Sequence, residues 1–278
     1  MITITPAFSD FIIMSDLDGT LIDHGNPVSS RNREAIERFT AAGGRFGIAT
    51  GRSLEWTKAL TEELPVNFPC VLYNGGVLYD FSNQEYLMRL FLPETARALV
   101  EKIAKQFPTT AILPVTEGEA FLEADEVQLV EYVTGMIADY TPVNGWRDSY
   151  VPWFKVLIAL PGGLFDDFFR FADTLGDEIS GMRLVATNKN LAELLPAHSS
   201  KGTALNKLVE MGLAKREQLV AVGDFYNDLE MICYAGIGAT LTDSPKDLQD
   251  IADVLVCPCA EGSLADLVEY LEKTYPAQ

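Results

Sequence analysis

Positive charge is scarce in this sequence: 21 lysines and arginines stand against 40 aspartates and glutamates, for a formal net charge of −19. A surface that binds nucleic acid or an anionic membrane needs clustered lysine and arginine, and no such cluster occurs along the chain. We therefore expect neither nucleic acid nor membrane as a partner. A small phosphorylated ligand is not excluded, because a few well-placed donors suffice to bind it.

Cysteine and long apolar runs are also lacking. The four cysteines, Cys70, Cys233, Cys257 and Cys259, are too few and too scattered for the disulfide framework of a secreted protein. The apolar run before Asp16 is too short for a signal peptide or a membrane span, and no basic segment precedes it. With 48% apolar residues the chain can form a globular core. We expect a cytoplasmic protein.

Two aspartates follow that first apolar run, Phe11–Met14, in the stretch Asp16–Thr20. Side chains two positions apart on extended backbone point the same way, so Asp16 and Asp18 are expected to face one reaction centre. The pair suits a carboxylate nucleophile with an acid–base partner. Taken alone, the stretch also fits a strand that ends in an ordinary Asp-Gly turn.

Helices and strands alternate after this stretch. The spacing of apolar residues predicts a helix from Ser29 to about Ala42, a strand at 45–50 and a second helix to about Leu64. This rhythm predicts a parallel sheet, which binds ligands at the carboxyl ends of its strands. Asp18 and Thr50 both fall there, and Thr50 also precedes a helix N-terminus that favours an anion.

The rhythm changes near Tyr79, after an Asn-Gly-Gly turn that predicts a hairpin. Mixed strands and helices follow, including a helix at about 126–138. We expect a Rossmann-like parallel-sheet core of α/β class at 1–79 and 197–278. An inserted α+β domain is expected at 80–196, as a cap over the strand ends.

Three further charged residues follow the insert. Lys201 opens a helix, where a cation opposes the helix dipole unless an anion holds it there; a solvated surface lysine is the alternative. Asp224 and Asp228 are four residues apart across a loop-to-helix junction and can converge on one point. They could also be helix caps.

Clustered carboxylates at the strand ends need a counter-ion. Each pair at ~4 Å repels by about 4 kcal/mol at an effective dielectric constant of about 20. A divalent cation would offset this repulsion, and oxygen ligands favour Mg²⁺. The expected cluster consists of Asp16, Asp18, Asp224 and Asp228. The donors that would bind a phosphoryl group are Thr50, Lys201 and Asn227.

Four stretches resemble, in order, the four motifs of the haloacid dehalogenase superfamily. They are Asp16–Thr20, Ala49–Arg52, Lys201–Leu205 and Gly223–Asp228. The insert between the second and third resembles the class IIB cap of the Cof-type sugar phosphatases. The resemblance covers essentially the whole chain.

This resemblance implies a role for each matching residue. Asp16 is expected to be the nucleophile that forms an aspartyl-phosphate, and Asp18 the general acid and base. The expected phosphate- or substrate-binding residues are Leu17, Thr50, Gly51, Arg52, Lys201 and Asn227. The expected metal ligands are the carboxylates of Asp16, Asp18, Asp224 and Asp228, with Mg²⁺ as the cofactor.

The leading interpretation is an Mg²⁺-dependent phosphatase of small phosphorylated metabolites, with sugar phosphates favoured, acting as a monomer or homodimer. A phosphomutase would use the same intermediate, and phosphate release without a bisphosphate activator separates the two. A non-catalytic metabolite-binding protein is the alternative from another class. We expect Lys201→Ala to lower turnover with little effect on folding. Arg52, Glu119 and Lys155 are candidate substrate contacts, although a structural or solvated role remains open for each.

Overall fold

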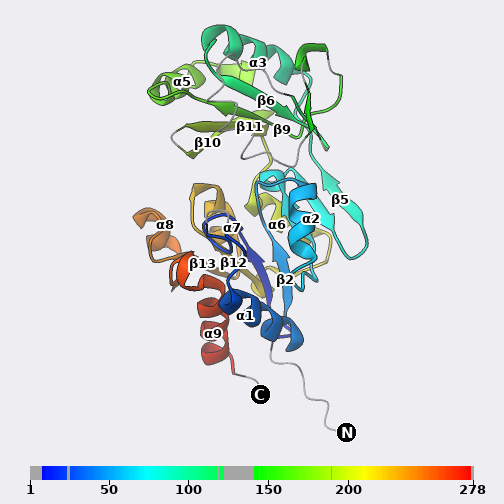
Figure 1. Cartoon of the computed structure of the whole chain (residues 1–278), viewed down its shortest axis with the longest axis vertical. Coiled ribbons are helices and arrows are strands. Elements are labelled where there is room, and N and C mark those ends of the chain that lie inside the picture. The colour runs from blue at the N-terminus through cyan, green and yellow to red at the C-terminus, as the bar shows by residue number, and fades with distance from the viewer. Residues whose placement is uncertain are drawn as a thin grey trace. The chain divides into compact units, whose positions relative to one another are not determined.

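The structure is a computed structural model whose described residues form two compact units, coloured along the chain in Figure 1. One unit joins Met1–Met88 to Ser200–Gln278, and the other is Arg89–Ser199. Both divisions fall later than the boundaries that we expected at 79/80 and 196/197. The described residues are 8–23, 26–117, 119–121, 141–143, 145–148, 150–188 and 190–276.

The first unit is built on a five-stranded parallel sheet in the order β14-β13-β12-β1-β2. β1 (Ile12–Ser15) lies between β12 and β2 and is buried along its whole length, as its apolar sequence predicts. The expected α/β class is confirmed. The other strands are β2 (Arg45–Ile48), β12 (Leu219–Gly223), β13 (Ile237–Leu241) and β14 (Val254–Val256).

Four of the helices of this unit form two packed pairs, α1 with α9 and α6 with α7 (Figure 1). Ion pairs of Arg31 with Glu269 and of Arg38 with Glu272 join α1 to α9. α6 and α7 share one apolar cluster with the sheet residues Ile12 and Met14. The helices are α1 (Ser30–Ala41), α2 (Leu54–Thr61), α6 (Lys201–Glu210), α7 (Leu229–Tyr234), α8 (Lys246–Ile251) and α9 (Ser263–Thr274).

The predicted hairpin is present and explains the later boundary. β3 (Cys70–Leu72) pairs with β4 (Val77–Asp80) in antiparallel fashion, and β5 (Glu85–Arg89) extends the same small sheet. The turn holds three successive residues at positive φ, ending with Gly75 at +92°. A Cβ on Gly75 would lie 2.1 Å from the carbonyl oxygen of Ser200, so only glycine lets the turn pack against the start of α6.

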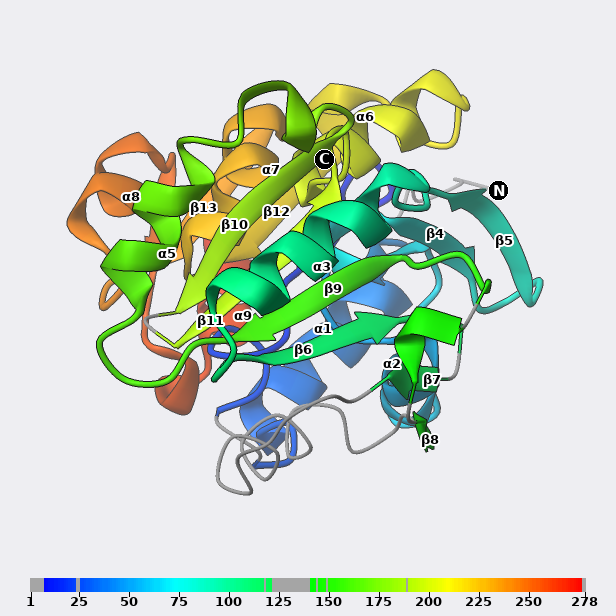
Figure 2. The ribbon, with the colours of Figure 1, turned by 90° about the horizontal axis from the view of Figure 1, so that it is seen from above.

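The second unit has a six-stranded sheet in the order β10-β11-β9-β6-β7-β8, with β7 and β8 parallel. Figure 2 shows α3 (Thr95–Gln106) and α5 (Phe165–Ala172) on the same face of this sheet. The apolar core of this unit contains residues of both helices and of the sheet, and Trp146, Trp153 and Phe168 are buried in it. The strands are β6 (Ala111–Val115), β7 (Glu119–Phe121), β8 (Thr141–Val143), β9 (Lys155–Ala159), β10 (Met182–Asn188) and β11 (Leu191–Pro196).

The helix expected at about 126–138 lies outside the described residues. Within the described part of the chain, no helix has both the length and the apolar character needed to cross a bilayer.

Candidate active site

Parallel register brings the expected site residues together at the carboxyl ends of three strands. Ser15 of β1 is paired with Val222 of β12, and the backbone N–H of Asp16 donates to the Val222 carbonyl at 2.9 Å. Asp16 and Asp224 therefore leave adjacent strands at nearly the same level. β2 runs parallel to β1 on its other side, so Thr50 emerges at the same edge. All of these residues belong to the first unit.

Three carboxylates form a compact cluster at this edge. Asp16, Asp224 and Asp228 each place an oxygen within 4.8 Å of the others. The Lys201 Nζ donates to Oδ1 of Asp16 and to Oδ1 of Asp228, at 2.5 Å in each case, and its side chain is 0% exposed. Although burial lowers it, these two carboxylates together raise the pKa of Lys201, which keeps the ammonium charged. Lys201 is therefore a buried counter-ion, and the surface alternative is wrong.

Asp228 shapes the loop that carries Asp224. Its Oδ1 accepts from Lys201, and its Oδ2 accepts from the backbone N–H groups of Asp224 and Phe225 at 3.1 and 3.2 Å. Both oxygens of Asp228 are thus engaged within the protein. Thr20 donates its hydroxyl to Oδ1 of Asp224 at 3.0 Å, which orients that carboxylate in turn. Asp16 and Asp224 are therefore better placed than Asp228 to meet a cation directly.

Asp18 lies outside this cluster, contrary to its expected place among the metal carboxylates. Its two carboxylate oxygens accept from Nε and Nη2 of Arg52 at 2.8 and 2.7 Å. The expectation assumed extended backbone, but β1 ends at Ser15 and the N–H of Gly19, at a φ of +86°, donates to the Ile22 carbonyl. The side chains of Asp16 and Asp18 consequently do not share one strand face.

Thr50 and Gly51 follow β2 at the same edge of the sheet. The Thr50 hydroxyl accepts from the backbone N–H of Arg52 at 3.1 Å, and its carbonyl accepts from the N–H of Asn74 at 3.0 Å. Asn227 donates from Nδ2 to Oδ1 of Asn74 at 3.4 Å. Asn74 thus links two of the expected phosphate-binding segments. From the sequence it was interpreted only as a turn residue, and its one other signal, a positive φ of 53°, needs the structure.

Leu17 has a different place from the other expected phosphate-binding residues. Its side chain is 0% exposed and its carbonyl accepts from the N–H groups of Thr20, Leu21 and Ile22. Its side chain belongs to the core, so Leu17 is able to meet a ligand only through its backbone.

The cluster fits a hard divalent cation. When ionised, the carboxylates of Asp16, Asp224 and Asp228 carry three negative charges against the one positive charge of Lys201. An anionic phosphate would add to this excess of negative charge. The candidate ligands that converge are carboxylate oxygens, which suit Mg²⁺ in preference to zinc or copper.

Burial, reinforced by the charge of Asp228, raises the pKa of Asp224 from 3.8 to about 6, although the Thr20 hydroxyl and Lys201 oppose the shift. Burial also raises the pKa of Asp16. A carboxyl group with a higher pKa in the folded chain than in the unfolded chain destabilises the fold when it ionises. The metal-free protein should therefore lose stability as the pH rises from about 4 to about 6.

Mg²⁺ binds ionised carboxylates, so its stabilising effect should grow over the same range. We expect Mg²⁺ to raise Tm by more at about pH 7 than at about pH 5, where protons compete for Asp224. Thermal melts with Mg²⁺ or with chelator at each pH measure this. A Tm increase of equal size at both pH values would contradict it.

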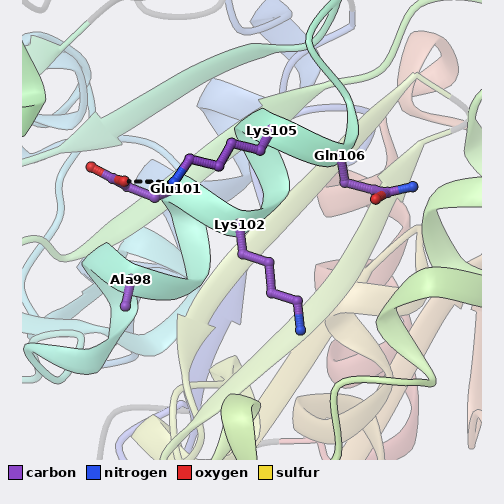
Figure 3. A pocket seen from close by; sticks show the side chains of 5 residues that line it. All are labelled: Ala98, Glu101, Lys102, Lys105 and Gln106. Atoms are coloured by element: carbon purple, nitrogen blue, oxygen red, sulfur yellow. Dashed lines mark ion pairs between the residues drawn. The ribbon is translucent and has the colours of Figure 1, made fainter.

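A hollow on the second unit differs from the carboxylate cluster in that its charges are balanced. It lies over α3, has a volume of about 440 Å³, and is lined by Glu101, Lys102 and Lys105 among others (Figure 3). Lys105 pairs with Glu101 at 3.5 Å, and Lys102 pairs with Glu178 at 2.6 Å. Its lysines are thus matched by exposed glutamates, as is usual on a solvated helix.

A family model described as haloacid dehalogenase-like hydrolase matches residues 13–267. The 5-amino-6-(5-phospho-D-ribitylamino)uracil phosphatase YwtE of Bacillus subtilis (strain 168) is 25% identical, over 93% of this chain and 97% of the relative. The pyridoxal phosphate phosphatase YbhA of Escherichia coli (strain K12) is 22% identical, over 92% of this chain and 97% of the relative.

Solved structures agree with this match. A haloacid dehalogenase-like hydrolase from Bacteroides thetaiotaomicron has a TM-score of 0.82 at 26% identity, covering 94% of this chain and 99% of that one. The subclass IIB sugar phosphatase BT4131 has a TM-score of 0.79 at 18% identity, covering 94% and 98%, and shows the same fold. The resemblance carried by the four motifs is confirmed, and this chain belongs to the haloacid dehalogenase-like hydrolases.

Proposed function

We propose that this chain is an Mg²⁺-dependent phosphatase that hydrolyses small phosphorylated metabolites through an aspartyl-phosphate on Asp16. The observation that carries the proposal is the buried contact of Lys201 with Asp16 beside Asp224. A carboxylate so placed is held in one orientation by a permanent cation, next to a second carboxylate with which it can share a metal ion. This is the arrangement that nucleophilic attack on an anionic phosphoryl group requires.

Each residue has a defined task in this proposal. Lys201 occupies Oδ1 of Asp16, so the other oxygen is the one that attacks phosphorus. The phosphorus–oxygen bond to the leaving group breaks as Asp18 gives its proton to that oxygen. Asp18 then takes a proton from the water that attacks the phosphorus, and the carboxylate of Asp16 is released with inorganic phosphate.

Mg²⁺, held by Asp16 and Asp224, would neutralise charge on the phosphoryl oxygens. Asp228 would hold the two metal ligands in place without binding the metal ion itself, because it accepts hydrogen bonds from Lys201 and from the backbone of Asp224. We accordingly propose Asp16 and Asp224 as metal ligands, with Asp18 as the acid and base. Thr50, Gly51 and Asn227 stay our proposed phosphate-binding residues.

The names of the relatives support this substrate class. One acts on a phosphorylated ribitylaminouracil, one on pyridoxal phosphate and one is a sugar phosphatase. All three substrates are small phosphate monoesters. Sugar phosphates, the phosphorylated pyrimidine and pyridoxal phosphate are therefore the first compounds to test.

The deciding experiment is a screen of these phosphate monoesters for release of inorganic phosphate, with Mg²⁺ and with excess chelator. We expect release with Mg²⁺ and a loss of at least about a hundredfold without it, because the carboxylates repel an anionic substrate unless a cation intervenes. Full turnover in chelator would overturn the metal requirement. Turnover only after addition of a sugar bisphosphate would indicate a phosphomutase instead.

A further inference from the structure

Arg52 is oriented from two sides in the first unit. Its guanidinium forms a two-bond contact with Asp18, at 2.8 and 2.7 Å. The same guanidinium lies over the ring of Trp56, with its carbon 4.3 Å from the ring centroid. The ring thus fixes the plane of the guanidinium, and the guanidinium fixes the plane of the carboxylate.

The local fold explains why Trp56 is in position to do this. Ser53 caps α2 by accepting from the backbone N–H of Trp56 at 3.2 Å. The Thr50 hydroxyl accepts from the backbone N–H of Arg52, so both ends of the segment are anchored. Arg52 precedes the Ser53 cap and Trp56 lies in the first turn of α2, so this junction brings the guanidinium over the ring.

Folding alone does not account for this arrangement. The side chains of Arg52 and Asp18 are 28% and 43% exposed, and an ion pair of that exposure contributes little to stability. What the two-bond contact does supply is direction, because a planar guanidinium matches a carboxylate in a single geometry. An exposed aspartate without it would sample several rotamers.

The two-bond contact with Arg52 is compatible with proton transfer by Asp18. A carboxylate offers about four lone-pair sites on its two oxygens, and Arg52 occupies one site on each. The remaining sites are available to the proton that passes to the leaving oxygen or arrives from water. Arg52 therefore orients the carboxylate and leaves positions on it that can carry a proton.

We propose that Arg52 and Trp56 are positioning residues for Asp18, which hold its carboxylate in the orientation that delivers a proton to the leaving oxygen. The inference rests on the proposed phosphatase function. It differs from the expectation that Arg52 binds the phosphate group itself, and the two roles have separable consequences. A phosphate contact is common to every substrate, whereas a placed acid matters only where the leaving oxygen needs a proton.

The test compares two substrates, p-nitrophenyl phosphate and the best alkyl phosphate from the screen. The aryl oxygen leaves without a proton, and the alkyl oxygen does not. The quantity to measure is kcat/KM, which covers binding and transfer to Asp16 but not the later hydrolysis of the intermediate. Dividing the alkyl value by the aryl value cancels any loss of phosphate binding.

Three variants form the series. Arg52→Lys keeps the positive charge but loses the two-bond contact with Asp18. Trp56→Leu keeps Arg52 but removes the aromatic ring over which its guanidinium lies. We expect each to lower the alkyl-to-aryl ratio by about tenfold or more. Trp56→Phe retains a ring face and should restore the ratio to within about threefold of the wild type.

The outcomes separate the inference from the function on which it rests. If kcat/KM falls by the same factor for both substrates, Arg52 is a phosphate contact and the inference is overturned, while the phosphatase function stands. An unchanged ratio in Trp56→Leu overturns it equally. If the wild type releases no phosphate from either substrate, the proposed function fails and the inference fails with it.

Discussion

Replacement of Lys201 by alanine is expected to lower turnover by at least about a hundredfold and to destabilise the fold by about 3–5 kcal/mol. The Nζ atom bridges Asp16 and Asp228 in a fully buried position. Removing it leaves two buried carboxylates without their counter-ion, and that of Asp228 is completely enclosed. The sequence led us to expect little effect on folding, and the complete burial of Lys201 corrects that expectation.

Lys207→Ala is the matched control, because Lys207 lies on the same helix with a half-exposed side chain and pairs with Glu210 at 3.0 Å. We expect it to change stability by less than about 0.5 kcal/mol and to leave turnover unchanged. Urea unfolding of both variants in chelator gives the stabilities, and phosphate release gives the rates. A Lys201→Ala protein with the stability and turnover of the Lys207→Ala control would contradict the buried ion pair.

Mg²⁺ adds a second readout to the Lys201 variant. Without the lysine, the carboxylates of Asp16, Asp224 and Asp228 have lost their internal cation, so a bound metal ion should offset more repulsion than it does in the wild type. We expect Mg²⁺ to raise the Tm of Lys201→Ala by more than it raises the Tm of the wild type.

Much of the fold followed from local patterns in the sequence. β1 and β12 were legible as short apolar runs, and each ends in an acidic loop. The rule that parallel strands bind ligands at their carboxyl ends was then enough to bring Asp16 and Asp224 together. The hairpin was equally legible, because Asn74 and Gly75 tolerate the positive φ values that the turn adopts.

The features that the sequence did not reveal depend on the direction of side chains and on how deeply they are buried. The alternation rule placed Asp18 beside Asp16, but it holds only while the backbone is extended, and the strand ends at Ser15. The burial of Lys201 is a tertiary property, since a cation in the first turn of a helix looks the same in sequence whether it is solvated or enclosed. The link from Asn227 to Asn74 joins residues far apart in the chain.

The two aspartates of the first loop should fail in different ways when each is replaced by asparagine. Asp16 is 5% exposed and in contact with Lys201, and an amide in its place has no carboxylate oxygen to take up the phosphoryl group. We expect Asp16→Asn to lose phosphate release on every substrate, alkyl or aryl. Measurable turnover by this variant would show that Asp16 is not the nucleophile.

Asp18→Asn should keep the nucleophile and lose only the proton transfers. Asparagine can still accept from Arg52 through its one oxygen, so the loop should stay in place. Alkyl phosphates should fail, because their leaving oxygen needs a proton. With p-nitrophenyl phosphate the first step should still occur, while hydrolysis of the intermediate, which needs a base for water, should stall.

The expected signature of Asp18→Asn is therefore a burst of about one p-nitrophenolate per site, followed by slow turnover. Phosphate should remain on the protein as a label that survives an acid quench, and Asp16→Asn, the matched control, should show neither burst nor label. Rapid-quench kinetics with radiolabelled phosphate would measure both. Should Asp18→Asn give no burst and no label while Asp16→Asn keeps activity, the roles of the two carboxylates are reversed, and the orientation imposed by Arg52 then belongs to the nucleophile.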